Sequence, residues 1–296
     1  MKRLFWVLLG LGLLAMPALT QQSVSPALLE LANAERAFAR MSVEKGVRDS
    51  FIANFADEGI NFTPHPTNTK EFYGKRPAQV LPLPVTLNWS PIYGDIAQSG
   101  ELGYTTGPFT LTDNTPAKRP TQHGMYFSIW RKQVDGKWKV LIDLGIQLNS
   151  AVAPLDAPFQ SALKWKVRSG GQDADKALAS LLATDRAFFA NAKTGAVAEA
   201  WKHLLSEHAR IHRNGEFPLV GKSAYSAWVK SQSSAITGEP IKAEVASSGE
   251  FGYSYGKYEI HATKPEKGYY VRVWKLDAKG NWRIVFDITS PLPEGK

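Results

Sequence analysis

An acidic residue lies within the apolar face of an expected helix at two places in the sequence. On a helical projection Glu35 lies about 40° from Leu31 and about 60° from Phe38. Asp185 holds the same place in a second apolar stripe, 150 residues later. Because an unpaired buried carboxylate costs several kcal/mol, each acid must have a partner or line a wet pocket. Each is therefore a general acid or base with a raised pKa, or a structural group bonded to a sheet. The presence of an acidic residue at both equivalent positions favours the structural role.

A second group of ionisable residues occupies 207–213, with the sequence Glu-His-Ala-Arg-Ile-His-Arg. In a strand, His208, Arg210 and His212 would share one face, and we expect that face to be a polar binding pocket. A register shift of one residue would turn all three outward, into a solvated or structural role. With His203, three histidines lie within ten residues. Zinc sites need three or four converging ligands, which spacing alone does not show, so we expect neither a metal nor a cofactor.

Two aromatic residues, Tyr225 and Trp228, lie on the helix expected after this strand and complete the expected pocket. A few polar groups in an aromatic wall are the usual form of a small-molecule site. The first half of the chain has Ile60 and Phe62 where the second half has Arg210 and His212. We therefore expect any ligand to bind in the second half, with an anionic group paired to Arg210. The candidate ligand-binding residues are Asp185, Arg210, His212, Tyr225, Trp228 and, in the first half, Glu35.

Other polar residues have weaker claims to a site. Asp143 and Asp287 lie at the ends of expected last strands, where they would close the pocket or cap a turn, and we expect the capping role. His65 and His123 are isolated histidines, expected in loops or at strand edges. Four tyrosines are equally suited to a pocket and to a core, because each has a polar tip on an apolar ring. They are Tyr104, Tyr126, Tyr253 and Tyr269.

Composition excludes several classes of chemistry. The 296 residues include no cysteine, which excludes disulfides, thiolate nucleophiles, cysteine-ligated zinc and iron–sulfur clusters. The sequence contains no Ser–His–Asp order, P-loop or glycine-rich dinucleotide motif. The formal net charge is +8, but lysine and arginine are scattered along the chain. Nucleic-acid-binding proteins cluster such residues, so we expect no nucleic-acid partner.

The sequence contains one unit twice. Residues 99–107 return as 248–256 with six of nine positions identical, and 35–38 return as 185–188. A pair of tryptophans eight residues apart also recurs. Matches in the same order at a nearly constant offset indicate duplication of a whole domain. We expect a signal peptide at 1–22, a first domain at 23–148, a linker at 149–172 and a second domain at 173–296.

Each copy places helices before strands. Ser25 is expected to cap the first helix and Gly46 to break it, with a shorter helix at 47–55. In the second copy, Asp175 is the expected cap and Ser223 the start of a third helix. Strand-like segments joined by turn sequences follow in both copies. Helices followed by hairpins predict an α+β fold with an antiparallel sheet.

The N-terminus predicts export. Lys2 and Arg3 precede an apolar run at 4–15 and small residues after it, which is the pattern of a secretory signal peptide. Twelve apolar residues are too few for a spanning helix, which needs about 20, although an uncleaved anchor stays open. We expect a periplasmic or secreted protein with no membrane span after cleavage. The absence of cysteine fits a bacterial periplasm better than a eukaryotic exterior.

The order of these motifs resembles the nuclear-transport-factor-2-like superfamily, in particular the SnoaL-like domains of exported bacterial proteins. The resemblance rests on Phe-Ala-Asp-Glu-Gly-Ile-Asn-Phe at 55–62, the Ser-Gly-Glu-x-Gly-Tyr repeats and the paired tryptophans. It implies two tandem cones, each with N-terminal helices packed in a curved sheet around a pocket. Superfamily members include isomerases, dehydratases and pure binding domains, so the fold does not give the function.

The ketosteroid isomerase branch implies a catalytic aspartate directly before a proline. Thr63-Pro64 and Arg213-Asn214 occupy that place in the two copies, so chemistry of that type is disfavoured. We expect a protein that binds a small polar or anionic ligand, or a polymer, without chemistry. An acid–base enzyme acting in the second cone and an envelope scaffold stay open. Domains of this superfamily often pair through the outer faces of their sheets. We therefore expect a monomer in which the two copies pair within the chain.

Overall fold

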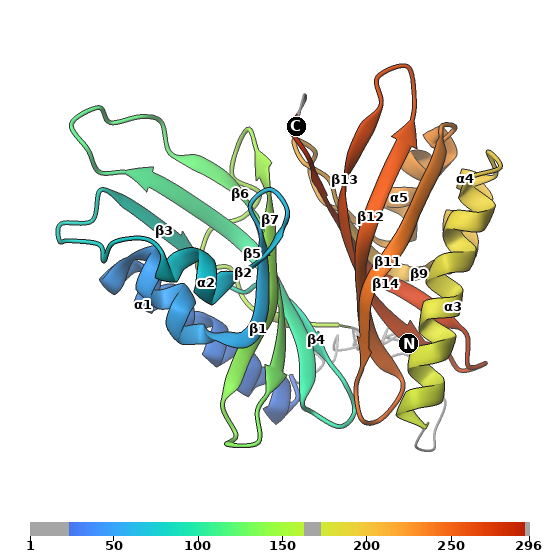
Figure 1. The fold of residues 1–296 in the computed structure, drawn as a ribbon, viewed down its shortest axis with the longest axis horizontal. Coiled ribbons are helices and arrows are strands. Elements are labelled where there is room, and N and C mark those ends of the chain that lie inside the picture. Colours follow the sequence, from blue (N-terminus) through green and yellow to red (C-terminus); the bar gives the residue numbers. More distant parts are fainter. Residues whose placement is uncertain (1–23, 163–172, 294–296) are drawn as a thin grey trace, which may run out of the picture.

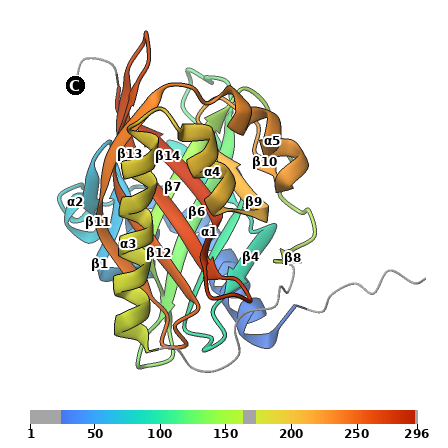
Figure 2. The ribbon, with the colours of Figure 1, turned by 90° about the vertical axis from the view of Figure 1, so that its right-hand side faces the viewer.

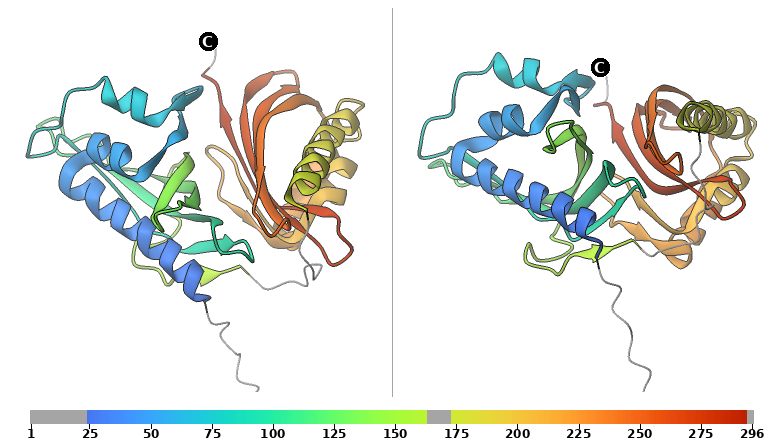
Figure 3. Two further views of the ribbon diagram at one scale, coloured as in Figure 1. Left: turned by 60° about the horizontal axis from the view of Figure 1, so that its bottom comes forward. Right: turned by 90° about the horizontal axis from the view of Figure 1, so that it is seen from below.

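Two curved sheets lie face to face in the middle of the molecule, with the helices on the outer sides (Figures 1 and 3). The computed structural model describes residues 24–162 and 173–293, so the expected signal peptide at 1–22 lies outside the described residues. Within the described ranges, no helix has both the length and the apolar character needed to cross a membrane. The α+β architecture with two cones, expected from the motifs, is confirmed.

The first copy begins with one long helix, α1 (Pro26–Asn54). The side chain of Ser25 accepts a hydrogen bond from the backbone N–H of Leu28 at its N-terminus, as expected for a cap. Gly46 has φ +84° and ψ 167°, so it bends the helix where the sequence predicted a break. The other elements are β1 (Phe55–Phe62), β2 (Pro66–Asn68), α2 (Thr69–Gly74), β3 (Val85–Trp89), β4 (Tyr93–Ile96), β5 (Leu102–Asp113), β6 (Gln122–Lys132), β7 (Trp138–Leu148) and β8 (Gln160–Ser161).

The second copy repeats this plan with longer edge elements. Asp173, rather than Asp175, caps its first helix by accepting the N–H groups of Asp175 and Lys176. The last helix starts at Gly221, two residues before the expected Ser223. The elements are α3 (Ala174–Ala192), α4 (Val197–Leu204), β9 (Leu205–His212), β10 (Leu219–Val220), α5 (Gly221–Ser231), β11 (Ala235–Val245), β12 (Phe251–His261), β13 (Glu266–Leu276) and β14 (Trp282–Pro291).

The two sheets share one topology. The first has the order β2-β1-β7-β6-β5-β4-β8, with β3 also paired to β5, and the second has the order β10-β9-β14-β13-β12-β11. All pairs of long neighbouring strands are antiparallel except two: β1 with β7 and β9 with β14 are parallel. A segment in the middle of the expected linker belongs to the first sheet, because β8 pairs with β4.

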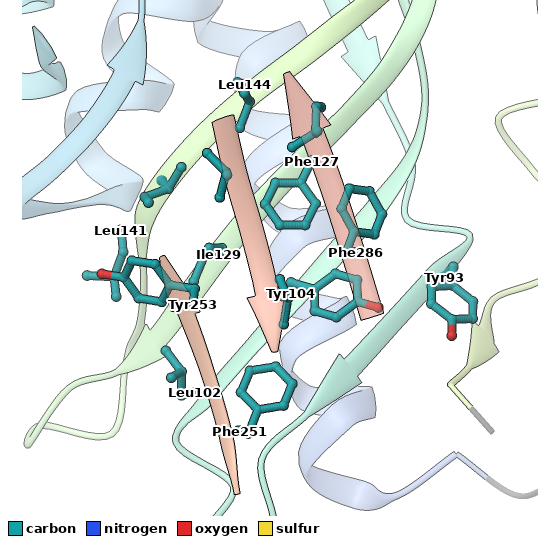
Figure 4. Close-up of a cluster of buried hydrophobic side chains, with 14 of the residues drawn as sticks. Tyr93, Leu102, Tyr104, Phe127, Ile129, Leu141, Leu144, Phe251, Tyr253 and Phe286 are labelled. Carbon is teal, nitrogen blue, oxygen red and sulfur yellow. The ribbon is translucent and has the colours of Figure 1, made fainter. Parts of the chain in front are cut away.

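Each sheet has one face covered by helices and one face turned toward the other sheet. The two faces that are turned toward each other form one apolar core (Figure 4). The Phe127 and Phe286 rings stack with centroids 4.3 Å apart, and Tyr104 lies 5.3 Å from Phe286 and 6.4 Å from Phe251. The pairing of the two copies expected from the resemblance is thus made within this chain, whereas the monomeric state of the mature protein stays a prediction.

Polar contacts surround this shared core. Lys275 of β13 forms a largely buried ion pair with Asp95 of β4, at 2.8 Å. At one end the Ser99 and Ser248 hydroxyls, which are equivalent positions of the duplicated sequence, lie 2.8 Å apart. At the other end His65 Nδ1 lies 2.9 Å from the Tyr269 hydroxyl. The two copies therefore make polar contacts on both sides of the shared core as well as beside it.

Candidate functional site

The cone of the second copy contains a cavity of about 350 Å³. It lies between the concave face of the second sheet and helices α3, α4 and α5, which cover that face in Figure 2. Aromatic side chains are the largest group in its wall, with two arginines and several other polar side chains among the rings. The aromatic residues of the wall are Phe188, Phe189, Trp201, Trp228, Tyr258 and Tyr270.

Four charged side chains form a chain of ion pairs at the back of this cavity. Arg272 donates from its Nη1 to Asp185 Oδ1 at 2.6 Å and from its Nε to Asp287 Oδ2 at 2.8 Å. Arg213 Nη2 lies 2.6 Å from Asp287 Oδ1. The Tyr270 hydroxyl donates to Asp185 Oδ2 at 2.7 Å. Both aspartates are fully buried, so each depends on the arginines for its charge compensation.

The aromatic wall also stabilises Arg272. Its guanidinium carbon lies 4.0 Å from the Phe188 ring centroid and 4.5 Å from that of Tyr270. Arg213 lies in the same way over Trp228, at 5.1 Å. Because cation–π contacts of this kind use the electron-rich ring faces, the protein's own arginines occupy positions that a cationic ligand would need.

Two residues of the cavity wall, Trp201 and Thr289, have a buried polar atom without a hydrogen-bond partner in the described part of the chain. Trp201 is 3% exposed, and the atom is its indole Nε1; in Thr289 it is the hydroxyl oxygen. An unmet buried donor costs about 1–3 kcal/mol, so natural proteins rarely leave one. Tryptophan can only donate, whereas the threonine hydroxyl can donate or accept.

The cone of the first copy is filled at the corresponding place. Glu35 is fully buried there. It accepts hydrogen bonds from Trp89 Nε1 at 2.6 Å, Trp130 Nε1 at 2.7 Å and Thr105 Oγ1 at 2.5 Å. Burial raises the pKa of Glu35, and these three donors oppose that shift. Three donors on one carboxyl group favour its ionised form, which accepts only.

A second acid, Asp143, lies near Glu35, and Ser128 interacts with both carboxyl groups. The Ser128 hydroxyl donates to Asp143 Oδ2 at 2.9 Å. Burial and the neighbouring Glu35 charge raise the pKa of Asp143 to about 8. Asp143 is therefore largely protonated at neutral pH. The expectation that Asp143 and Asp287 cap turns is wrong, because both side chains belong to the interior networks of their cones.

Strand pairing identifies the substitutions that make the two cones different. Trp89 pairs with Phe109 on β5, and Gly238 pairs with Tyr258 on β12, so a glycine replaces the tryptophan that fills the first cone. Ser128 pairs with Asp143 on β7. The equivalent pair on β13 and β14 is Arg272 with Asp287, so an arginine replaces the serine between the two acids.

The structure brings together some of the predicted residues. Trp228 lines the cavity, and Asp185 lies directly behind it, joined to Arg272. Tyr225 is buried outside the cavity wall, where its hydroxyl donates to the Ser206 carbonyl at 2.9 Å and holds α5 on β9. Glu35 lies in the other cone, in the structural role favoured by its repetition.

Arg210 and His212 do not enter the cavity. The Arg210 guanidinium lies 3.5 Å from the Tyr93 ring centroid, and the His212 ring lies 4.6 Å from that of Phe286, so both face the first copy. Burial and the charges of Arg210 and Arg213 lower the pKa of His212 to about 3, so this histidine is neutral. The expectation that Arg210 meets an anion in the cone is therefore corrected.

Alternation along β9 accounts for this position. Ala209 and Ile211 pack in the second core and Arg213 lines the cavity, so Arg210 lies on the opposite face of the strand. β1 and β9 have the same register shift against β7 and β14, so Ile60 and Arg210 are equivalent, as the offset of 150 predicts. The face that these residues share is turned toward the other sheet, so the expectation that it faces the inside of the cone is wrong.

Arg272 and Arg213 are the functional residues that the sequence analysis missed. Arg272 interrupts the strand sequence Tyr-Tyr-Val-Arg-Val-Trp at 269–274, where a charged residue between apolar neighbours is an informative exception. Within residues 24–162 and 173–293, no group of three or more histidine, aspartate or glutamate side chains could hold a metal ion. His203 and His208 are exposed.

No protein-family model and no curated protein matches this sequence. Solved structures are similar to single copies. A ketosteroid isomerase-like protein from Erwinia carotovora atroseptica SCRI1043 aligns at 17% identity over 40% of this chain and 98% of its own, with a TM-score of 0.36. A nuclear transport factor 2-like superfamily protein from Salmonella enterica serovar Typhimurium LT2 aligns at 14% identity over 41% and 95%, with a TM-score of 0.34. A protein of unknown function and of the same fold from Shewanella oneidensis MR-1 aligns at 12% identity over 38% and 96%, with a TM-score of 0.32.

Proposed function

We propose that this chain is a binding protein that holds a small organic ligand in its second cone, while the first cone is structural. The observation that carries the proposal is the cavity of the second cone, whose wall contains six aromatic side chains. Two of its lining residues, Trp201 and Thr289, have a buried polar atom with no partner among the described residues, and we propose that Trp201 Nε1 donates to the ligand. The wall of aromatic rings fits the flat body of a ring compound. The first cone has Trp89 and a triply bonded Glu35 in the equivalent space.

The charges around the cavity favour an uncharged ligand. Arg213 and Arg272 are its two cations, and both are paired with Asp287. Asp185 lies behind the wall, and Glu216 and Glu266 line it, so carboxylates outnumber guanidinium groups. An anion would therefore meet net repulsion, and a cation would compete with arginines already seated on the rings. An uncharged ring with a carbonyl oxygen satisfies Trp201 without either cost.

The same geometry disfavours the acid–base alternative for the second cone. A general acid or base needs a proton that it can give or accept near a reacting atom. Asp185 and Asp287 are instead held in ion pairs with Arg272 and are fully buried. The acids with raised pKa values, Glu35 and Asp143, lie in the first cone, apart from the cavity. A pure scaffold also does not need a ligand-sized cavity.

A series of naphthalenes with one ring system and three charges tests the proposal. We expect calorimetry on the mature protein to show binding of 2-acetylnaphthalene, with weaker binding of 2-naphthoate and of 2-naphthylmethylammonium. Trp201→Phe keeps the ring but loses the N–H donor, and it should weaken binding of the ketone by roughly 2–10-fold, the worth of one neutral hydrogen bond. Trp138→Phe is the matched control, because Trp138 has a buried, unpartnered Nε1 in the first copy.

Each outcome of this experiment bears on a different part of the proposal. If no member of the series binds, the second cone is not a site for ring compounds. If the naphthoate binds most tightly, the charge argument is wrong. If Trp201→Phe and Trp138→Phe behave alike, the free indole N–H does not recognise the ligand.

We also propose that the protein is exported. Support comes from the basic, apolar and small-residue order of residues 1–22 in the sequence. Sequencing the N-terminus of the protein from a periplasmic extract should find a start after Ala18 to Gln22. A product that still begins at Met1 and sediments with membranes would instead indicate an uncleaved anchor.

A further inference from the structure

The loop at the mouth of the cavity is bonded to the first copy. This mouth loop, residues 213–216, follows β9 and supplies Arg213, Asn214 and Glu216 to the cavity wall. Gly215 has φ +77°, which suits glycine, and the Glu216 N–H donates to the Arg213 carbonyl at 3.1 Å, closing a tight turn. Asn214, Gly215 and Glu216 are all exposed, so packing within the second copy does little to fix them.

The anchor of this loop is Gln147, near the end of β7. Its backbone N–H donates to Asn214 Oδ1 at 3.0 Å, and its carbonyl accepts the Gly215 N–H at 2.9 Å. Two opposite hydrogen bonds to one residue fix both the position and the direction of the loop. They are the kind of pairing that two antiparallel strands make, although here one donor–acceptor pair uses a side chain.

The anchor is itself rigid. Ile146 and Leu148, on either side of Gln147, are buried at 0% and 8% exposure in the core between the sheets. On its other side, β7 is paired with β6, where Gln147 lies opposite Gly124. The loop is therefore held by a residue that sheet pairing and buried neighbours fix in place.

From this arrangement we propose that the first copy positions the ligand-binding loop of the second, so that ligand binding and the packing of the two copies are coupled. This inference rests on the proposed function of the second cone. Asn214 is the positioning residue. A loop that is fixed before binding does not lose conformational freedom when the ligand enters, so the anchor raises affinity without touching the ligand. Releasing the loop from its anchor lowers the fraction of molecules that are competent to bind, and the apparent affinity falls in proportion to that fraction.

Three variants separate this positioning role from a general structural one. Asn214→Ala removes the acceptor for the Gln147 N–H, whereas Asn214→Asp keeps an oxygen there. Ser248→Ala removes a hydrogen bond between the copies at the opposite end of the interface. We expect Asn214→Ala to weaken binding of 2-acetylnaphthalene about 3–10-fold. Asn214→Asp should restore most of the affinity, and Ser248→Ala should leave it unchanged.

Hydrogen exchange supplies a measurement that does not need a ligand. The amides of Gln147 and Gly215 should exchange slowly in the unmodified protein and at least tenfold faster in Asn214→Ala, but not in Ser248→Ala. Because coupling is reciprocal, 2-acetylnaphthalene should also slow exchange at Gln147, a residue of the copy that does not bind it. A merely structural contact would not respond to the ligand.

The outcomes are distinguishable from those of the proposed function. If no naphthalene binds the unmodified protein, the proposed function fails, and exchange at Gln147 and Gly215 decides alone whether the loop is anchored. If the ketone binds but all three variants bind it equally, the coupling is wrong and the binding site stands. Equal losses in Asn214→Ala and Ser248→Ala would show a general dependence on the interface, and would also overturn the proposal.

Discussion

The interiors of the two cones show how one architecture accepts two opposite solutions to a buried acid. In the first copy, Glu35 is surrounded by neutral donors, and Asp143 beside it keeps its proton. In the second copy, Asp185 and Asp287 are ionised partners of one arginine. The first solution fills the cone with indole rings, and the second leaves room for a cavity. The difference teaches that a conserved shape need not preserve a site, because one serine-to-arginine and one tryptophan-to-glycine difference change both charge and volume.

The largest effect is expected from emptying the filled cone. Trp89→Ala removes a buried indole packed 4.7 Å from the Phe38 ring and takes one donor from Glu35. We expect the free energy of unfolding, measured by urea titration, to fall by about 3–5 kcal/mol. Indole added to the variant should restore part of this loss by occupying the space. Trp228→Ala is the matched control in the second cone, and its half-buried side chain should cost clearly less. Equal costs would mean that the first cone is no better filled than the second.

Removal of the central cation should destabilise the open cone nearly as much. Arg272→Met keeps most of the side-chain volume but leaves Asp185 without its arginine and Asp287 with Arg213 alone. Breaking a buried ion pair from one side costs about 3–5 kcal/mol, and we expect a loss in that range by urea titration. Arg210→Met, at the interface, should cost less than 1 kcal/mol. A small effect of Arg272→Met would contradict the view that the buried aspartates depend on it.

A change of pH should distinguish the two acids at equivalent positions. The folded protein holds the Asp143 proton with a pKa raised from 3.8 to about 8. The stabilisation from that proton is therefore complete below about pH 4 and is lost as the pH rises through 8. Asp143→Asn, which cannot ionise, should gain stability relative to the unmodified protein between pH 6 and pH 9. Asp287→Asn should lose stability over the same range, because Arg213 then loses its carboxylate partner and Arg272 keeps Asp185 alone. The same sign for both variants would remove the contrast between the cones.

The smallest effect is expected at Arg210. The sequence predicted that this residue would meet an anionic ligand, but its guanidinium lies over Tyr93 between the copies. Arg210→Ala should therefore change the affinity for 2-acetylnaphthalene less than twofold in calorimetry. Arg213→Ala should weaken it more, because Arg213 lines the cavity. The reverse order would place the ligand between the sheets.

Local signals in the sequence predicted the fold well. Duplication, the Ser25 cap and the Gly46 break depend on short-range chemistry, and the structure has all three. The interior position of Glu35 and Asp185 also followed from helical periodicity.

The site was less accessible to sequence reasoning for a specific reason. Alternation along β9 places Arg210 and Arg213 on opposite faces, but it does not show which face is turned toward the helices and which toward the other sheet. Arg272 lies on a strand whose role became clear only when Asp185 and Asp287, 87 and 15 residues away in sequence, were placed beside it. Contacts at such separations depend on the whole tertiary structure.

The pairing of two sheets within one chain has a consequence for how such a protein can change over time. In a dimer of identical subunits, every substitution appears in both cones at once, so an arginine that opens one cavity also puts a charge into the other. A tandem chain separates the two positions, and Ser128 can persist while its equivalent is Arg272. The partner sheet meanwhile stays attached at any dilution, because the tether keeps its local concentration high. Gene duplication followed by divergence can thus turn a symmetric pair into a specialised half and a supporting half without ever passing through a separated state.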